Sequence, residues 1–231
     1  MTYLPSTSGH DRARGAWLAP GAAFYSKPIL ALYDINVLGF SNAFVWKCPT
    51  RLIVDHYNAH VTGRHLDVGV GTGYFLDHCT FPVRHPSLTL MDLNPNSLSM
   101  AAQRVRRYHP LAVLADVAAP VRPPTTPFDS IGLGYLLHCL PGTMHDKVAT
   151  IDHLAALLNP GGVLFGTTIL GTGVPHTQLA RRFLRFYNHR GVFSNRNDSR
   201  QALIEVLAAR FRPTSVHVRV EGSVALFAAR C

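Results

Sequence analysis

The chain has 231 residues, of which 47% are hydrophobic, and this suits one α/β domain with a sizeable core. Its net charge is +9, but the arginines are spread along the chain, so we interpret them as solvated helix faces rather than a nucleic-acid module. No signal-peptide pattern, run of about 18 apolar residues or metal-ligand spacing of the four cysteines occurs, and we expect a cytoplasmic protein without membrane span or metal.

The chain begins with two segments of different composition. Residues 1–20 are rich in Gly, Pro, Ser and charged residues and predict a flexible lead-in. Residues 21–62 are apolar and aromatic and predict two or three helices, the last running from Arg51 to about Ala59 with Thr50 as its cap. We expect residues 21–62 to form a helical cap on the domain that follows.

A glycine-rich turn follows at residues 67–73, where an apolar strand ends in Asp-x-Gly-x-Gly-x-Gly. Glycines at this spacing allow a ligand to lie against the main chain, and the next helix offers free N–H groups. The dinucleotide pattern Gly-x-Gly-x-x-Gly would need a glycine where Tyr74 stands. A nicotinamide-binding enzyme is therefore a distant alternative.

Two further strand-like runs end in an acid, at Asp92 and at Asp116. Carboxyl ends of neighbouring parallel strands meet at one crevice of an open α/β sheet. We expect Asp92 to be suited to binding a ribose diol there. Between these runs, Asn94 and Pro95 predict the start of a helix that ends near Tyr108.

The second half predicts two more parallel strands and a closing hairpin. A strand at 130–133 leads to Gly134, and a helix from about 145 to 158 is expected to stop at 159–162 before a strand at 163–168. A helix at about 199–210 is then followed by two strands, expected at 215–220 and 223–228.

An insertion at about 171–198 carries a helix in which aromatic and basic residues are interleaved, from about His176 to His189. This mixture could contact RNA, but at helical spacing it favours an amphipathic lid over a substrate.

Five motifs, in order, resemble those of class I S-adenosylmethionine (SAM)-dependent methyltransferases. They are the glycine motif at 67–73, Asp92, Asp116, the segment 128–138 and the turn 157–165. The resemblance covers about residues 50–231 and is closest to the small-molecule branch, which includes quinone C-methyltransferases and many natural-product methyltransferases. It implies a Rossmann-like α/β fold, with a seven-stranded, mostly parallel sheet, an antiparallel last strand and helices on both faces.

The resemblance also implies the residues of the site. SAM, and its product S-adenosylhomocysteine (SAH), would be bound by Asp67, Gly69, Val70, Gly71, Gly73, Asp92, Leu93, Asp116, Val117 and Gly134. Candidates for the substrate pocket are Tyr25, Tyr33, Asn42, Trp46, Tyr135, His138, Tyr187 and Asn188. The first four belong to the cap and could instead be part of its core. Candidate bases are His138, His189 and Tyr33, although His138 could instead hold its local turn in place.

The expected function is methyl transfer to a small, apolar or aromatic metabolite by in-line displacement. Gly134 opens a segment without the Asn/Asp-Pro-Pro-Tyr/Phe motif of base amino methylation, so nucleic acid is an unlikely substrate, and RNA methylation is an alternative. A second alternative is a SAM-binding protein without methyl-transfer activity. We expect a monomer or a homodimer.

Overall fold

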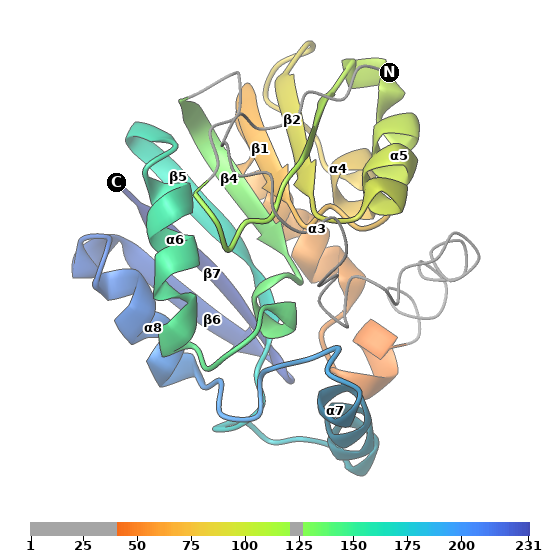
Figure 1. Ribbon diagram of the computed structural model, residues 1–231, viewed down its shortest axis with the longest axis vertical. Coiled ribbons are helices and arrows are strands. Elements are labelled where there is room, and N and C mark those ends of the chain that lie inside the picture. Colours follow the sequence, from red (N-terminus) through yellow and green to blue (C-terminus); the bar gives the residue numbers. More distant parts are fainter. Residues whose placement is uncertain (1–40, 121–126) are drawn as a thin grey trace, which may run out of the picture.

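The computed structural model describes residues 41–120 and 127–231, and these contain one seven-stranded sheet of order β3-β2-β1-β4-β5-β7-β6 (Figure 1). Neighbouring strands are parallel from β3 to β5, whereas β7 is antiparallel to both β5 and β6. The predicted sheet is thus confirmed. The strands are β1 (Arg64–Val68), β2 (Ser87–Asp92), β3 (Leu111–Leu114), β4 (Phe128–Gly134), β5 (Leu158–Ile169), β6 (Val216–Glu221) and β7 (Val224–Arg230).

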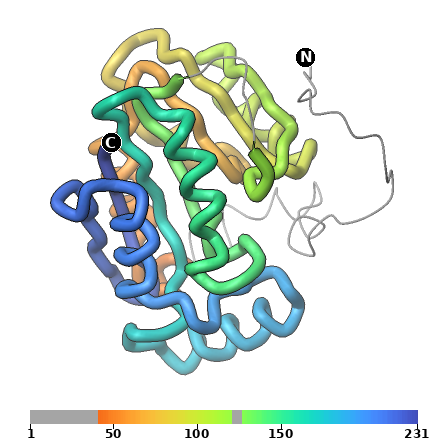
Figure 2. Tube along the Cα trace, turned by 60° about the vertical axis from the view of Figure 1, so that its left-hand side comes forward, coloured from red at the N-terminus to blue at the C-terminus, as the bar shows by residue number. Residues whose placement is uncertain are grey.

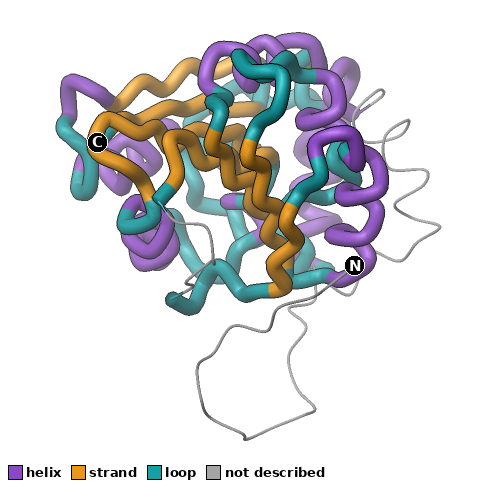
Figure 3. Tube along the Cα trace, turned by 90° about the horizontal axis from the view of Figure 1, so that it is seen from above, coloured by secondary structure: helices purple, strands orange, loops and turns teal. Residues whose placement is uncertain are grey.

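Helices cover both faces of this sheet (Figure 3). On one face lie α3 (Thr50–His60), α4 (Tyr74–His78) and α5 (Pro95–Arg104), which share a core with the inward side chains of β2 and β5. On the other face α6 (Val148–Ala155) and α8 (Arg200–Ala208) lie side by side (Figure 2). Because the central strands are covered on both sides, their side chains are almost all buried.

The chain reverses its direction of travel across the sheet between β1 and β4. It first runs outward from β1 through β2 to β3, and then returns to place β4 and β5 on the other side of β1. Such a reversal leaves a crevice at the carboxyl ends of the strands, since the two connections leave in opposite directions. The longest helix in the described residues, α7 (Gln178–His189), lies beyond this end of the sheet (Figure 1).

Polar side chains begin three of the helices. Asn94, Thr177 and Ser199 each accept a hydrogen bond from a backbone N–H in the first turn of α5, α7 and α8, at 2.8, 3.0 and 3.1 Å. The predicted cap at Thr50 is wrong, because α3 begins at Thr50 and its N-cap is Pro49, without a side-chain bond. The Thr50 hydroxyl instead accepts from the Asn42 side chain at 3.0 Å.

Two further boundaries differ from the prediction. Residues 159–162 do not separate a helix from β5; they form an irregularity inside β5, which pairs with β4 at Leu158 and again from Val163. The Asn159 side chain donates to Asp129 across this irregularity at 2.6 Å. In addition β3 ends at Leu114, so Asp116 lies in the loop beyond the strand.

Several predictions concern other parts of the chain. The lead-in at 1–20 and the cap as far as residue 40 lie outside the described residues, and so do Tyr25 and Tyr33.

Candidate functional site

A pocket opens at the carboxyl ends of β1, β2, β3 and β4. Its walls come from the glycine-rich turn after β1, the loops after β2 and β3, and the segment after β4. All ten predicted cofactor residues line it, which brings together positions from Asp67 to Gly134. The lining also includes residues that were not predicted for this role: Tyr57, Thr72, Phe75, Asn94, Ser97, Ala118, Leu136, Cys139, Leu140 and Pro141.

The glycine-rich turn has two kinds of glycine. A Cβ on Gly73, whose φ is +74°, would lie 2.9 Å from the backbone of Ala101, so this glycine lets α5 pack closely. Gly71 also has positive φ, +52°, but a Cβ there would meet no described atom within 4 Å. Gly71 thus presents bare main chain to the open pocket, where a ligand can lie against it.

Asp92 ends β2 with its carboxylate in the pocket. Its Oδ1 accepts from the N–H of Asn94 at 2.8 Å. Burial raises the pKa of Asp92 to about 6, although backbone hydrogen bonds from Asn94 and Gly71 favour the charged form. A partly buried carboxylate of this kind gains from hydroxyl donors that replace the lost water. Asp116, by contrast, is exposed and accepts from the N–H of Ala118 at 2.9 Å.

Asp67 is buried beneath the pocket and is held by a residue from α3. The Tyr57 hydroxyl donates to its Oδ1 at 3.0 Å, and the His65 Nε2 lies 3.6 Å from the same oxygen. Burial, together with the charge of Asp67, raises the pKa of Tyr57 well above its usual value, so the phenol stays protonated and remains a donor. The Tyr57 oxygen also occupies the space next to Gly134, where a Cβ would lie 2.5 Å away.

Tyr135 follows Gly134 with a strained backbone. Its φ is +58°, which is uncommon for a bulky residue and concentrates at functional sites. Its N–H donates to the Thr167 carbonyl at 3.0 Å, and its hydroxyl donates to Asn42 Oδ1 at 2.9 Å. Of these two predicted pocket residues, Tyr135 lines the pocket and Asn42 is buried behind it.

Aromatic rings continue from the pocket toward α7. Phe75 and Tyr135 stand at the pocket, the His138 ring lies 5.7 Å from Tyr135, and Phe193 lies 4.5 Å from His138. Beyond Phe193 the series reaches the predicted pocket residues Trp46 and Tyr187, together with Phe183 of α7.

His138 is buried and tied to β5. Its Nδ1 accepts from the N–H of Ile169 at 3.3 Å and lies 3.4 Å from the Thr168 hydroxyl. Because a backbone N–H can only donate, the neutral ring carries its proton on Nε2. Burial and the nearby charge of Lys147 lower the pKa of His138 to about 3. This geometry favours the second of its two expected roles, holding the local turn.

The other predicted polar residues lie on α7. His189 is exposed in the last turn, and Asn188 bonds to Asn195 in the loop that follows rather than to a pocket residue. Over the described ranges, no cluster of three or more His, Cys, Asp or Glu side chains could hold a metal ion. None of the helices placed by the structure is long and apolar enough to span a membrane.

Known proteins are similar to this chain in sequence. A methyltransferase-domain family model matches residues 66–164. The chain is 40% identical to demethylluteothin O-methyltransferase of Streptomyces thioluteus, over 89% of this chain and 90% of that protein. It is 36% identical to the physcion biosynthesis cluster O-methyltransferase of Aspergillus chevalieri, over 90% and 94%.

Solved structures share the fold. The N-methyltransferase NodS from Bradyrhizobium japonicum WM9, in complex with SAH, has a TM-score of 0.57 at 17% identity and covers 88% of this chain and 96% of its own. The chain therefore belongs to the class I SAM-dependent methyltransferases that act on small molecules, and SAM is its cofactor.

Proposed function

We propose that this enzyme methylates a hydroxyl oxygen of a small, planar aromatic metabolite. The observation that carries the proposal is the series of aromatic rings that begins at the cofactor pocket with Phe75 and Tyr135 and continues to Phe193 and Trp46. Aromatic walls favour a flat, apolar acceptor by stacking and edge-to-face contacts. The two relatives in sequence from Streptomyces thioluteus and Aspergillus chevalieri are both O-methyltransferases and support oxygen as the acceptor atom.

We assign the cofactor residues by the shape and polarity of the pocket. Asp92 and Leu93 would hold the ribose, with the partly buried carboxylate accepting from the diol. Asp116, Val117 and the N–H groups beside them would face the adenine. The remaining part of SAM would lie along 67–73 and Gly134, where Gly71 leaves open space beside the main chain.

When bound, SAM supplies an already activated methyl group, so the protein's task is to orient the acceptor and to exclude water. A general base adds about 10²–10⁴-fold to such a reaction. We propose that His138, with its proton on Nε2, orients groups near the acceptor and does not remove the acceptor's proton. His189 and Tyr33 remain candidates for that role. The predicted lid, the insertion at about residues 171–198, would cover the acceptor.

Matched probes test the proposal. Purified enzyme and methyl-labelled SAM are incubated with naphthol and anthracenol isomers, each paired with the amine of the same ring system, and products are identified by mass. We expect transfer of one methyl group to the hydroxyl compounds and at least tenfold less to the amines. Equal or faster methylation of the amines, or products without an aromatic ring from a metabolite extract, would contradict it. Bulk RNA serves as a control that should take up no label.

A further inference from the structure

Lys147 and Asp198 form an ion pair inside the protein, outside the cofactor pocket. The Lys147 Nζ lies 2.7 Å from Asp198 Oδ2, and each side chain is only 1% exposed. The same Nζ donates to the Ser194 carbonyl at 2.9 Å. A buried lysine is rare. Burial of an ion pair removes two charges from water, and two apolar side chains in the same place would often be at least as stable. The pair therefore calls for a role other than stability.

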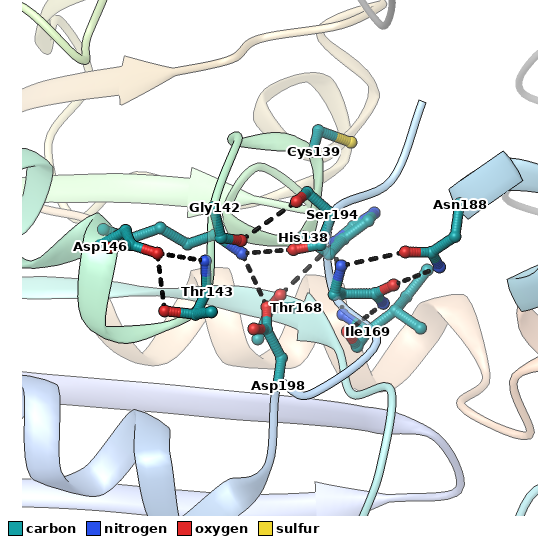
Figure 4. Close-up of polar contacts among 12 residues, drawn as sticks. His138, Cys139, Gly142, Thr143, Asp146, Thr168, Ile169, Asn188, Ser194 and Asp198 are labelled. Carbon is teal, nitrogen blue, oxygen red and sulfur yellow. Dashed lines mark hydrogen bonds and ion pairs between the residues drawn. The ribbon is translucent and has the colours of Figure 1, made fainter. Parts of the chain in front are cut away.

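The ion pair joins two segments that are far apart in the sequence. Lys147 ends the segment after β4, residues 135–147, which we call the post-β4 segment. Asp198 ends the loop after α7, residues 190–198, which we call the lid loop. Ser194 of the lid loop makes two more bonds to the post-β4 segment: its N–H donates to the His138 carbonyl at 2.8 Å and its hydroxyl to the Gly142 carbonyl at 3.1 Å (Figure 4).

Asn195 connects the lid loop to β5 and to α7. Its Nδ2 donates to the Ile169 carbonyl at 2.8 Å, and its Oδ1 accepts from Asn188 at 2.8 Å. The Asn195 N–H also donates to Asn188 Oδ1 at 3.3 Å. The end of α7 is thereby fixed to the lid loop, so the position of that loop sets the position of the helix.

The lid loop and the cofactor pocket are linked through the post-β4 segment. In the N-terminal half of the post-β4 segment, Tyr135 and residues 139–141 line the pocket. At its other end, Lys147 binds the lid loop. Between them Phe193 of the lid loop packs edge-on against His138, and Trp46 contacts Phe193 with ring centroids 6.3 Å apart.

We propose that Lys147 and Asp198 are positioning residues for methyl transfer. The Lys147 ammonium binds two groups of the lid loop in fixed directions, and this holds Phe193 and α7 over the acceptor side of the pocket. Two apolar side chains could fill the same space, but they could not fix the loop's register through directed bonds to Ser194 and Asp198. The inference rests on the proposed function, because it takes the acceptor to bind between the cofactor pocket and α7.

A single and a double variant separate the effect of the ion pair on positioning from its effect on stability. Lys147→Met leaves a buried carboxylate without its partner and should lower the melting temperature by about 6–15 °C. Adding Asp198→Asn removes the unpaired carboxylate and should recover most of that loss. The control neutralises an exposed pair, Arg210→Met with Asp152→Asn, whose side chains are 46% and 51% exposed. This control should behave as wild type, because exposed pairs contribute little.

Trp46 reports the lid position without any acceptor. In a Trp17→Phe background Trp46 is the only tryptophan. With saturating SAH, the Lys147→Met, Asp198→Asn enzyme should show a red-shifted Trp46 emission and at least tenfold faster tryptic cleavage after Arg190. Its SAH affinity should stay within threefold of wild type, while kcat/KM for 1-naphthol should fall at least tenfold through KM. If the Lys147→Met, Asp198→Asn enzyme keeps the wild-type Trp46 emission and the wild-type rate of tryptic cleavage, the proposal is overturned. This outcome does not depend on whether naphthol is an acceptor.

A measurement on the unmodified enzyme keeps the test decisive if the variants do not fold. Hydrogen exchange of the SAH complex should show the N–H groups of Ser194, Asn195 and Asp198 protected to the level of α8. Exchange of these amides within tenfold of the unprotected rate would show that the lid loop is not anchored, and would overturn the proposal.

Discussion

Asp92→Asn should change cofactor binding and stability in opposite directions. The wild-type carboxylate is partly buried at the end of β2, and this burial raises its pKa from 3.8 to about 6. Each pKa unit is worth about 1.36 kcal/mol, so ionised Asp92 destabilises the unliganded protein by about 3 kcal/mol at pH 7.5. A neutral amide of the same shape removes this cost, and its oxygen can still accept from Asn94.

The sign of the pH dependence follows from proton binding. Between pH 3.8 and 6 the folded protein holds a proton on Asp92 that the unfolded chain has lost, so stability decreases as pH rises through this window. The gain from Asp92→Asn should therefore be near zero below pH 4 and reach its full value above pH 6. Thermal or urea unfolding of the unliganded proteins at pH 4.5 and 7.5 measures it.

Cofactor binding should respond in the other direction. A ribose hydroxyl that donates to a carboxylate gains about 1.5–3 kcal/mol, so Asp92→Asn should weaken SAH binding about 10- to 150-fold at pH 7.5. Wild-type affinity should also fall as the pH drops below about 6, while the affinity of the variant stays flat. Calorimetric titration with SAH gives both curves. Equal affinity of the two proteins at pH 7.5, or parallel pH profiles, would refute the assignment of Asp92.

Three substitutions, at Gly71, Tyr57 and Gly134, test the rest of the pocket, and Gly161→Ala serves as a control. Gly71→Ala and Gly161→Ala each place a Cβ in open space at positive φ, so each should cost about 1–2 kcal/mol of stability. Only Gly71→Ala should weaken SAH binding at least tenfold. Equal effects of the two substitutions on SAH binding would refute the role of Gly71. Tyr57→Phe removes a donor to buried Asp67 and should cost about 1–3 kcal/mol in urea unfolding, whereas unchanged stability would show that this hydrogen bond contributes nothing. Gly134→Ala places a Cβ 2.5 Å from the Tyr57 oxygen and should lower the melting temperature, an effect that Tyr57→Phe in the same chain should partly relieve; no relief would contradict the steric cause.

The cofactor side of the site could be predicted because its signals are local. The glycine-rich turn, Asp92 and Asp116 each stand at the end of an apolar run, and the parallel order of the runs brings these ends together. Asn94 was also predictable as a helix start, since capping depends on neighbours two or three residues away.

Features that depend on distant partners could not be predicted. Residues 159–162 have the composition of a turn, but pairing with β4 keeps them inside β5. Lys147 has no local mark of burial, and only Asp198 and Ser194 explain it. Tyr57 similarly looks like any aromatic residue of an amphipathic helix until α3 packs above Asp67. The residues on the acceptor side of the site therefore had to be identified from the structure rather than from the sequence.

A crystal structure of the enzyme with SAH tests the central claim most directly. The claim is that the adenosyl group lies across the carboxyl ends of β1, β2 and β3, held by Asp92 and resting on the main chain at Gly71. We predict both ribose hydroxyls within about 3.2 Å of acceptor atoms that include the Asp92 carboxylate, and the homocysteine tail between Gly71 and Gly134. A ribose bound away from Asp92, or a side chain filling the space beside Gly71, would contradict the account.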